Sequence, residues 1–281
     1  MFLIPAFLFM AVFLYYPFLQ NIVNSFMKIR NLGGGVKGVN NPFYKNYAEL
    51  LTDPNMRVAL KNTVIMIFVT LFGEVGLAVI LAMLVDNVKR GTKFFRIVYF
   101  FPIVISATAL GVLFNLIFQY DGGMLSQMVG EKTNWKELYP LTVMMTPVVW
   151  QYVGFYFIIL VTGLNNIPEE LYESAAIDGA TRWQRLTKIT LPCIMPTIVM
   201  MFVVGVGTSF IAGFDNILLL YMPSTYNVAD TIYTYTYRMA FTSGANYSLS
   251  AASGLFQSVV GTALLLISNT LSRKVTDSSL F

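Results

Sequence analysis

The chain has 281 residues, of which 56% are hydrophobic and 11% are charged, and its net charge is +4. Because a typical soluble domain is about 25% charged, this composition argues against an ordinary soluble protein and predicts an integral membrane protein. There is no histidine, which excludes imidazole metal sites, Ser-His triads and histidine proton relays. The basic residues form no cluster of the kind that indicates nucleic-acid binding.

Six apolar stretches are long enough to cross a bilayer, which takes roughly 20 predominantly apolar residues. In chain order they cover about 2–25, 63–85, 97–118, 141–164, 191–213 and 254–271. The sequence therefore predicts an all-α fold, with six transmembrane helices in one domain over residues 1–281. The first stretch begins almost at Met1 without a basic leader or a small-residue cleavage site, so we expect a retained span and not a signal peptide.

The basic residues bear on the orientation of these spans. If the segment 166–190 is cytoplasmic, nine of the 18 Lys and Arg residues lie inside and nine outside, so their number alone does not decide. The inside set lies in short loops near span ends, which is where the positive-inside rule operates. We therefore expect both termini in the cytoplasm.

Glu74 falls near the middle of the second stretch, where a charge costs about 2.5–3.5 kcal/mol on insertion scales. Either this side chain contacts a cavity or a partner subunit, or it is protonated or hydrogen-bonded between helices. The sequence leaves both interpretations open.

A polar segment, residues 166–190, separates the fourth stretch from the fifth. Pro-Glu-Glu at 168–170 predicts the start of a helix, with two acids that complement the helix dipole. Thr181 with Gln184 three residues later predicts a capping box, and hence a second helix just past Gly179. The sequence therefore predicts two short amphipathic helices joined at Gly179, both too polar to span.

The spacing in this segment resembles the cytoplasmic coupling loop of ATP-binding-cassette (ABC) importer permeases. The residues that correspond to it are Glu173, Ala175, Ala176, Asp178, Gly179, Leu191 and Pro192, while Ser174 stands where the family usually has its first alanine. The runs IPEELYESAAIDGA, WQRLTKITLP and NYSLSAASGLF are similar to the carbohydrate branch, the maltose-type permeases. The C-terminal third most resembles the oligosaccharide and lipo-oligosaccharide group.

This resemblance implies the type I ABC importer permease fold in the bacterial cytoplasmic membrane. It also implies a heterodimer with a second permease subunit, two ABC ATPases at the coupling loops and an extracytoplasmic sugar-binding protein. ATP and Mg would then be bound by the ATPases, so this chain is expected to hold no cofactor and no catalytic site. The resemblance further implies that Glu173 pairs with a basic ATPase residue, that Gly179 lets the elbow enter the ATPase cleft, and that loop displacement tilts the fifth span.

Candidate sugar contacts are the polar and aromatic residues deep in spans four and five, since sugars stack on aromatic faces and hydrogen-bond through their hydroxyls. They are Trp150, Gln151, Tyr152, Phe155, Tyr156, Ser209, Gly213, Asp215 and Asn216. Positions 152 and 156, like 151 and 155, lie one turn apart, so each pair is expected to line one wall. Ser209 and Asn216 resemble positions that contact sugar in the maltose channel. The alternative for each residue is an interfacial belt or helix packing.

The function expected from these features is ATP-driven import of sugars, above all oligosaccharides. An ABC permease for another solute would share the loop but not the carbohydrate-type runs. An ion-coupled secondary transporter would usually show inverted repeats and intramembrane acids, of which only Glu74 is present. An enzyme is least favoured, because no nucleophile-base pair or metal cluster is evident.

Overall fold

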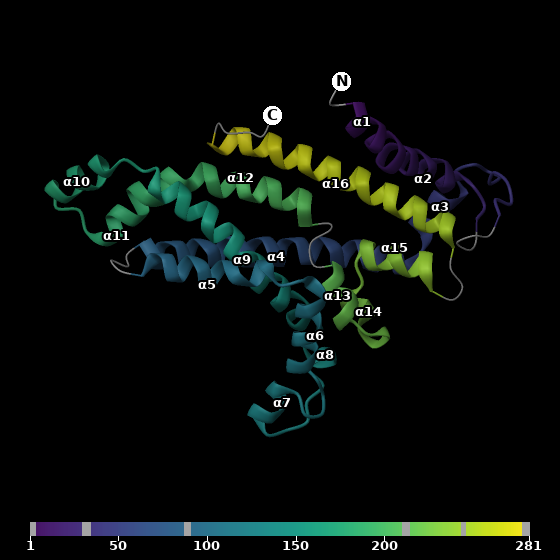
Figure 1. Ribbon diagram of the computed structural model, residues 1–281, viewed down its shortest axis with the longest axis horizontal. Helices are drawn as coiled ribbons and strands as arrows, with labels where there is room; N and C mark the ends of the chain where they lie inside the picture. Colours follow the sequence, from purple (N-terminus) through teal and green to yellow (C-terminus); the bar gives the residue numbers. More distant parts are fainter. Residues whose placement is uncertain (1–3, 30–34, 87–90, 210–213, 243–245, 277–281) are drawn as a thin grey trace. The chain divides into compact units, whose positions relative to one another are not determined.

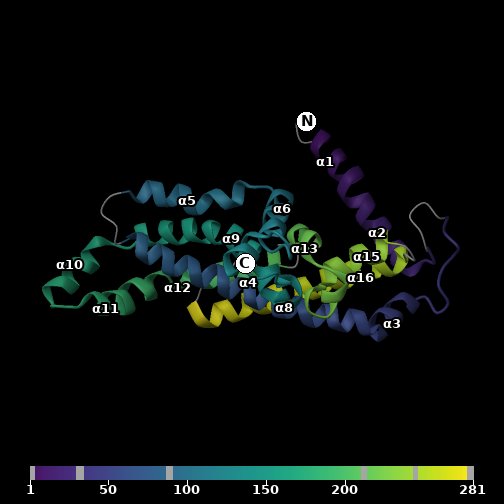
Figure 2. The same cartoon turned by 90° about the horizontal axis from the view of Figure 1, so that it is seen from below.

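The computed structural model describes residues 4–29, 35–86, 91–209, 214–242 and 246–276. Within these ranges every regular element is a helix, apart from one isolated bridge between Met27 and Val39 (Figures 1 and 2). Five of the described helices are long and apolar enough to cross a membrane, and one bent pair makes a sixth candidate. The predicted all-α architecture with six spans is therefore confirmed.

The helices belong to two compact units. Unit 1 comprises Met1–Val64 and Tyr226–Val260, and unit 2 comprises Ile65–Thr225 and Gly261–Phe281. Unit 1 contains α1 (Ile4–Met10), η1 (Ala11–Tyr15), α2 (Tyr16–Phe26), α3 (Lys45–Thr52), the start of α4 (Pro54–Asp86), α14 (Tyr226–Ala229), α15 (Ile232–Phe241) and the start of α16 (Tyr247–Thr276). The expectation of one transmembrane domain stays a prediction.

Unit 2 contains the remainder of α4 and α16 and the helices between them. These are α5 (Thr92–Val104), α6 (Ala107–Ile117), α7 (Met124–Val129), α8 (Trp135–Leu138), α9 (Pro140–Asn165), α10 (Glu169–Ile177), α11 (Arg182–Arg185), η2 (Leu186–Thr190), α12 (Leu191–Ser209), α13 (Phe214–Leu220) and η3 (Pro223–Thr225). In both views α5 runs beside α9, and α12 also packs on α9 (Figures 1 and 2).

The second span begins earlier than its apolar run. Helix α4 starts at Pro54 instead of near residue 63, because its N-terminus is well capped. Proline is favoured at the first helical position, and the Asp53 carboxylate accepts a hydrogen bond of 2.8 Å from the backbone N–H of Asn55.

The third span, predicted as one stretch over 97–118, is broken. Helices α5 and α6 are bent by 95° at the two residues Ile105 and Ser106. Pro102 lacks the N–H that would continue the α5 ladder, and the Ser106 hydroxyl caps α6 by accepting from the Ala109 N–H at 3.2 Å. The average hydrophobicity of the stretch predicts the span correctly. It does not reveal the break, which depends on Pro102 and Ser106.

Unit 1 is held together by a buried polar network at the start of α15. Asp230 is 2% exposed and forms an ion pair with Arg238, and it also accepts from the Thr234 hydroxyl at 2.7 Å. The Asn62 amide donates to the Asp230 carbonyl at 3.0 Å. One helical turn along, the fully buried Tyr235 donates its hydroxyl to Asp53 at 2.6 Å. These bonds connect α15 to the N-terminal part of α4.

Tyr235 makes this network sensitive to alkaline pH. Burial, with the hydrogen bond to Asp53, raises the pKa of Tyr235 above its ordinary 10.0. As pH rises past about 10 the unfolded chain loses this proton while the folded unit keeps it, so stability present below that pH is lost above it. We expect Tyr235→Phe to weaken the fold by about 1 kcal/mol at neutral pH and to flatten the alkaline loss. Thermal unfolding of the detergent-solubilised protein measures both, with the exposed Tyr44→Phe as control. An unchanged alkaline slope in Tyr235→Phe contradicts this assignment.

In unit 2 the backbone of α9 lies in direct contact with the backbone of α5. A Cβ atom added at Gly154 would lie 1.8 Å from the carbonyl oxygen of Tyr99. Small residues allow such close approach between membrane helices, whose association depends on packing because lipid is as apolar as the side chains. Phe157 and Leu160, both fully buried, continue this contact face into the main apolar cluster.

Gly154→Ala should therefore destabilise the protein by roughly 1–3 kcal/mol or more, because the obstacle is backbone that cannot rotate away. Gly76→Ala on α4 is the matched control, since a Cβ atom there meets nothing within 4 Å. Thermal unfolding in detergent compares the two variants. Equal unfolding temperatures would show that the close contact between α5 and α9 does not contribute to stability.

Candidate coupling segment and transport pathway

The candidate coupling segment follows the C-terminus of α9. Helix α10 begins at Glu169, one residue after Pro168, and Glu169 and Glu170 lie in its first turn. Acidic side chains there face the positive end of the helix dipole. The predicted helix start is confirmed, with Pro168 as the N-cap residue instead of the first helical residue.

Helix α10 ends in a Schellman motif. The N–H of Gly179 donates to the carbonyl of Ala176 at 3.1 Å, and the N–H of Ala180 donates to that of Ala175 at 2.9 Å. Gly179 has φ +73°, a left-handed conformation that glycine adopts without strain. The Ala-Ala and Gly spacing that resembles a coupling loop is thus also the pattern of a helix C-terminus.

The predicted capping box at Thr181 is confirmed. The Thr181 hydroxyl accepts a hydrogen bond from the backbone N–H of Gln184 at 3.3 Å. The side-chain oxygen of Gln184, Oε1, accepts from the backbone N–H of Thr181 at 2.8 Å. The helix that starts there is not a separate short helix, however, and this part of the prediction is wrong. It continues through a π-helical turn, η2, directly into α12, so that one helix covers Arg182–Gly207. Pro192 lies within this helix and does not begin it.

A hydrogen bond closes the elbow between these two helices. The Tyr172 hydroxyl on α10 lies 2.9 Å from that of Thr190 in η2. This contact joins residues on both sides of Gly179 and so connects α10 to the helix that continues into α12.

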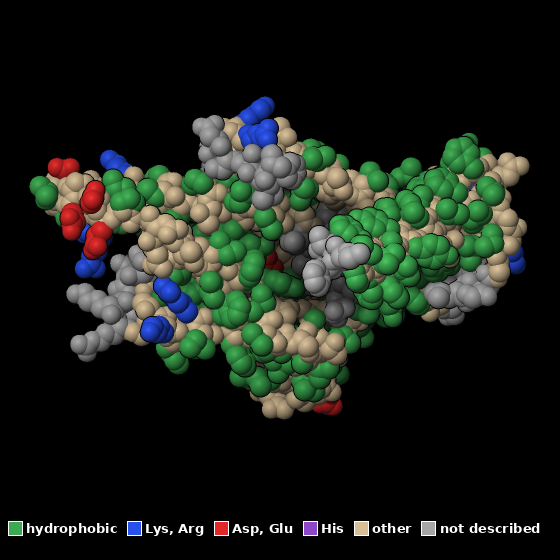
Figure 3. Space-filling model, turned by 45° about the horizontal axis from the view of Figure 1, so that its top comes forward, with side chains coloured by type: hydrophobic (Ala, Val, Ile, Leu, Met, Phe, Trp, Pro, Cys, Tyr) green, Lys and Arg blue, Asp and Glu red, His purple; other side chains and the backbone are tan. Residues whose placement is uncertain are grey.

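Most of the predicted coupling residues are accessible. Glu173, Ala176, Asp178, Gly179 and Pro192 are exposed, whereas Ala175 and Leu191 are half-buried. Figure 3 shows acidic and basic side chains gathered at the end of unit 2 formed by α10 and α11. Among the described residues Glu173 has no ion-pair partner.

Two apolar side chains stand out on this polar segment, and the sequence analysis missed both. Ile177 is 87% exposed and Trp183 is 71% exposed. A large apolar residue flanked by charges outside any span was the signal available in the sequence. Exposed aromatic and aliphatic anchors of this kind are typical of protein interfaces.

The left-handed turn at Gly179 can be tested by a pair of substitutions. Asparagine tolerates this conformation, whereas valine is strained in it by about 1–2 kcal/mol or more. We expect hydrogen exchange of the α10 amides to rise in Gly179→Val and to change little in Gly179→Asn, as measured by mass spectrometry. Similar exchange in both variants would mean that the turn does not depend on the backbone conformation of residue 179.

Phe155 and Tyr156 on α9 line a cavity of about 370 Å³ with Pro196, Met200 and Val204 of α12. The two rings are in a T-shaped arrangement, with centroids 5.7 Å apart. Phe155 is exposed and Tyr156 is buried. Two aromatic residues with apolar neighbours form a wall on which a sugar face can stack.

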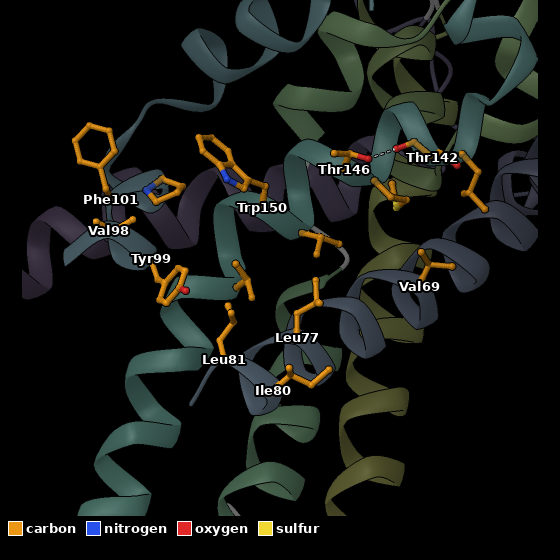
Figure 4. Close-up of a pocket in the computed structure, with 15 residues that line it drawn as sticks. Val69, Leu77, Ile80, Leu81, Val98, Tyr99, Phe101, Thr142, Thr146 and Trp150 are labelled. Atoms are coloured by element: carbon orange, nitrogen blue, oxygen red, sulfur yellow. Dashed lines mark hydrogen bonds between the residues drawn. The ribbon is translucent and has the colours of Figure 1, made fainter. Parts of the chain in front are cut away.

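Trp150 lies on a different face of α9. It lines a groove of about 860 Å³ between α4, α5 and α9, together with Tyr99, Phe101 and Thr146 (Figure 4). The groove is lined almost entirely by apolar side chains, and the Thr146 hydroxyl bonds to the Thr142 carbonyl of its own helix. Like the cavity at Phe155 and Tyr156, this groove offers a sugar aromatic and apolar surface with few hydrogen-bonding groups.

Gln151 and Asn216 are buried and bonded to each other. Gln151 is 5% exposed and Asn216 is 1% exposed, and the Asn216 amide donates to Gln151 Oε1 at 3.1 Å. The Gln151 amide donates in turn to the carbonyl of Ile105 at 3.1 Å. Tyr152 packs against the main apolar cluster, to which Tyr156 belongs, whereas Phe155 lines the cavity with α12. The lining of sugar-contacting walls by 151 with 155 and by 152 with 156 stays a prediction.

The other candidates are less informative. The Ser209 hydroxyl bonds to the Gly205 carbonyl of its own helix. Gly213 lies outside the described residues, as does the side chain of Asp215 at the start of α13. Glu74 is 3% exposed, and its Oε1 has no hydrogen-bond partner among the described residues. The described residues contain no group of three His, Cys, Asp or Glu that could hold a metal ion.

Residues 74–277 match the family described as the binding-protein-dependent transport system inner membrane component. The match covers most of the chain, which belongs to this family and is a multi-pass membrane protein. The family resemblance predicted from the sequence is confirmed. The members are permease subunits of transporters, so the chain is a component of a transport system.

Relatives and solved structures agree over nearly the full length. The polygalacturonan/rhamnogalacturonan transport system permease protein YteP of Bacillus subtilis (strain 168) is 27% identical over 99% of this chain and 88% of its own length. A bacterial ABC transporter that imports the acidic polysaccharide alginate matches with TM-score 0.87 and 29% identity, covering 98% of this chain and 94% of that chain. Its complex with an alginate pentasaccharide-bound periplasmic protein matches with TM-score 0.86 and 28% identity, over 99% and 95% of the two chains. The predicted type I importer permease fold is thereby confirmed.

Proposed function

We propose that this chain is a channel-forming subunit of an ATP-driven importer for oligosaccharides. The observation that supports this most strongly is the full-length likeness to the alginate transporter chain, at TM-score 0.87 and 29% identity. In this proposal a second permease subunit completes the channel, two ATPases drive it, and an extracytoplasmic binding protein delivers the sugar.

The segment from α10 to η2 is the proposed contact with an ATPase, on the cytoplasmic side together with both termini. Its exposed Glu173 is available to a basic residue of the ATPase, and Ile177 and Trp183 supply apolar anchors beside it. Because α10 bonds to η2 through Tyr172 and Thr190, closure of the ATPases would move α12 with the segment.

The cavity at Phe155 and Tyr156 is the proposed sugar-contacting wall in this subunit. It lies between α9 and α12, and α12 is the helix that the coupling segment would move. Trp150, Tyr152, Ser209, Gly213 and Asp215 stay predicted contacts with less support.

The test is ATP-dependent sugar uptake into proteoliposomes that hold the complete complex with its binding protein. Glu173→Ala and Gly179→Val should each lower uptake about tenfold or more, because one removes a charge at the proposed interface and the other strains its turn. Glu170→Ala is the matched control, since this exposed acid lies on the same helix in its first turn. A panel of oligosaccharides, amino acids and other solutes identifies the substrate class.

Uptake that persists without the ATPases, or that follows an ion gradient, would replace this proposal with a secondary transporter. If uptake needs ATP but occurs only with non-sugar solutes, the chain is an importer subunit and the proposed sugar substrate is wrong.

A further inference from the structure

The break between α5 and α6 is joined to two other helices by one side chain. Gln151 at the middle of α9 uses its amide hydrogen to bind the Ile105 carbonyl and its amide oxygen to accept from Asn216 on α13. Glutamine can make both bonds at once because it is a donor and an acceptor. In a membrane span the Ile105 carbonyl needs such a partner, since lipid offers none.

Helices α6 and α13 are themselves packed tightly together. A Cβ atom added at Gly111 of α6 would lie 2.5 Å from Leu219 Cδ1 of α13, so the two helices meet at a glycine. Both are short, and both lie in the half of unit 2 away from α10 (Figure 1). The pair therefore has a packed interface between its members, and it is joined to α9 by the Gln151 bonds and by a ring contact between Phe114 and Trp150, whose centroids lie 5.8 Å apart.

Helix α9 also leads to the coupling segment. From Gln151 it runs to Asn165, about 21 Å at 1.5 Å per residue, and α10 follows at Glu169. The bonds of Gln151 thus lie on a continuous helix, whose C-terminal end leads to the proposed ATPase contact.

We propose that Gln151 and Asn216 are positioning residues that fasten the α6–α13 pair to α9, so that movement of the coupling segment is transmitted to the far half of unit 2. This inference rests on the proposed transport function, and it assigns these two residues a role other than sugar binding. Both side chains are buried, and both polar groups of Gln151 are already bonded. The Asn216 Oδ1 atom is buried and has no hydrogen-bond partner among the described residues.

The test uses the complete complex in proteoliposomes and measures sugar uptake and ATP hydrolysis together. In Gln151→Met and in Asn216→Leu we expect the amount of sugar taken up per ATP hydrolysed to fall about tenfold, the loss that an unpaired buried polar group can cause. The KM for sugar should change less than about twofold, since neither residue touches it. The double variant should be no worse than Gln151→Met alone, because that substitution already removes the bonds to both Ile105 and Asn216.

Two further variants separate this effect from misfolding. Thr162→Val is the control, since this exposed hydroxyl bonds only to the Ile158 carbonyl within α9. The exchanged pair Gln151→Asn with Asn216→Gln keeps a donor and an acceptor on each side and should recover part of the coupling. Direct sugar contact would instead raise the KM for sugar and leave the amount of sugar taken up per ATP hydrolysed unchanged, and that result would overturn the proposal. So would a double variant whose loss of uptake per ATP is the product of the two single losses.

Hydrogen exchange provides a readout that does not depend on transport. In Gln151→Met the amides of 107–117 and of 214–220 should exchange faster together, because the two helices are released as a pair. No increase in either helix would overturn the proposal. If the wild-type complex takes up no sugar, the proposed function fails, and the exchange data still decide whether the connection exists.

Discussion

The need to satisfy every backbone polar group within the membrane is the constraint on which this structure depends. Unbroken helices meet it internally, and most of the described spans are of this kind. The third span does not, because Pro102 interrupts its ladder and the chain turns by 95° at Ile105 and Ser106. The turn is stable where it lies because Ser106 caps α6 and Gln151 covers the exposed carbonyl. The position of α6, and of α13 packed on it, follows from that arrangement.

Close packing at glycine residues stabilises the contacts between helices in lipid, where the hydrophobic effect does not drive helix association. Besides Gly154 against Tyr99, a Cβ atom at Gly205 would lie 2.2 Å from Leu71 Cδ2 and 3.0 Å from the Tyr156 hydroxyl. A Cβ atom at Gly207 would lie 2.5 Å from Leu265 Cδ1. Helix α12 is thus packed closely on both α4 and α16 within unit 2, while its first turns extend into the coupling segment.

The elbow itself is built from local backbone interactions. The Schellman motif ends α10, the capping box starts α11, and the π-helical turn passes the chain on to α12 without a break. The Tyr172–Thr190 hydrogen bond adds a contact across Gly179 to these local interactions. The exposed Ile177 and Trp183 then lie on a surface whose position relative to α12 is defined by the fold.

The sequence by itself determined the features that depend on neighbouring residues. Apolar runs predicted the spans, Thr181 and Gln184 predicted a cap, and Gly179 predicted a turn, because hydrophobicity and helix capping are local properties. The run at 97–118 was predicted without its break, since its average apolarity outweighed Pro102 and Ser106. Only the tertiary structure decided which side of α9 each residue occupies. Trp150 faces the groove, Phe155 and Tyr156 face α12, and Gln151 reaches Ile105 and Asn216. These contacts join residues 46 and 65 positions apart, and the rotation of α9 that creates them is set by packing against α5 and α12, which no local pattern encodes.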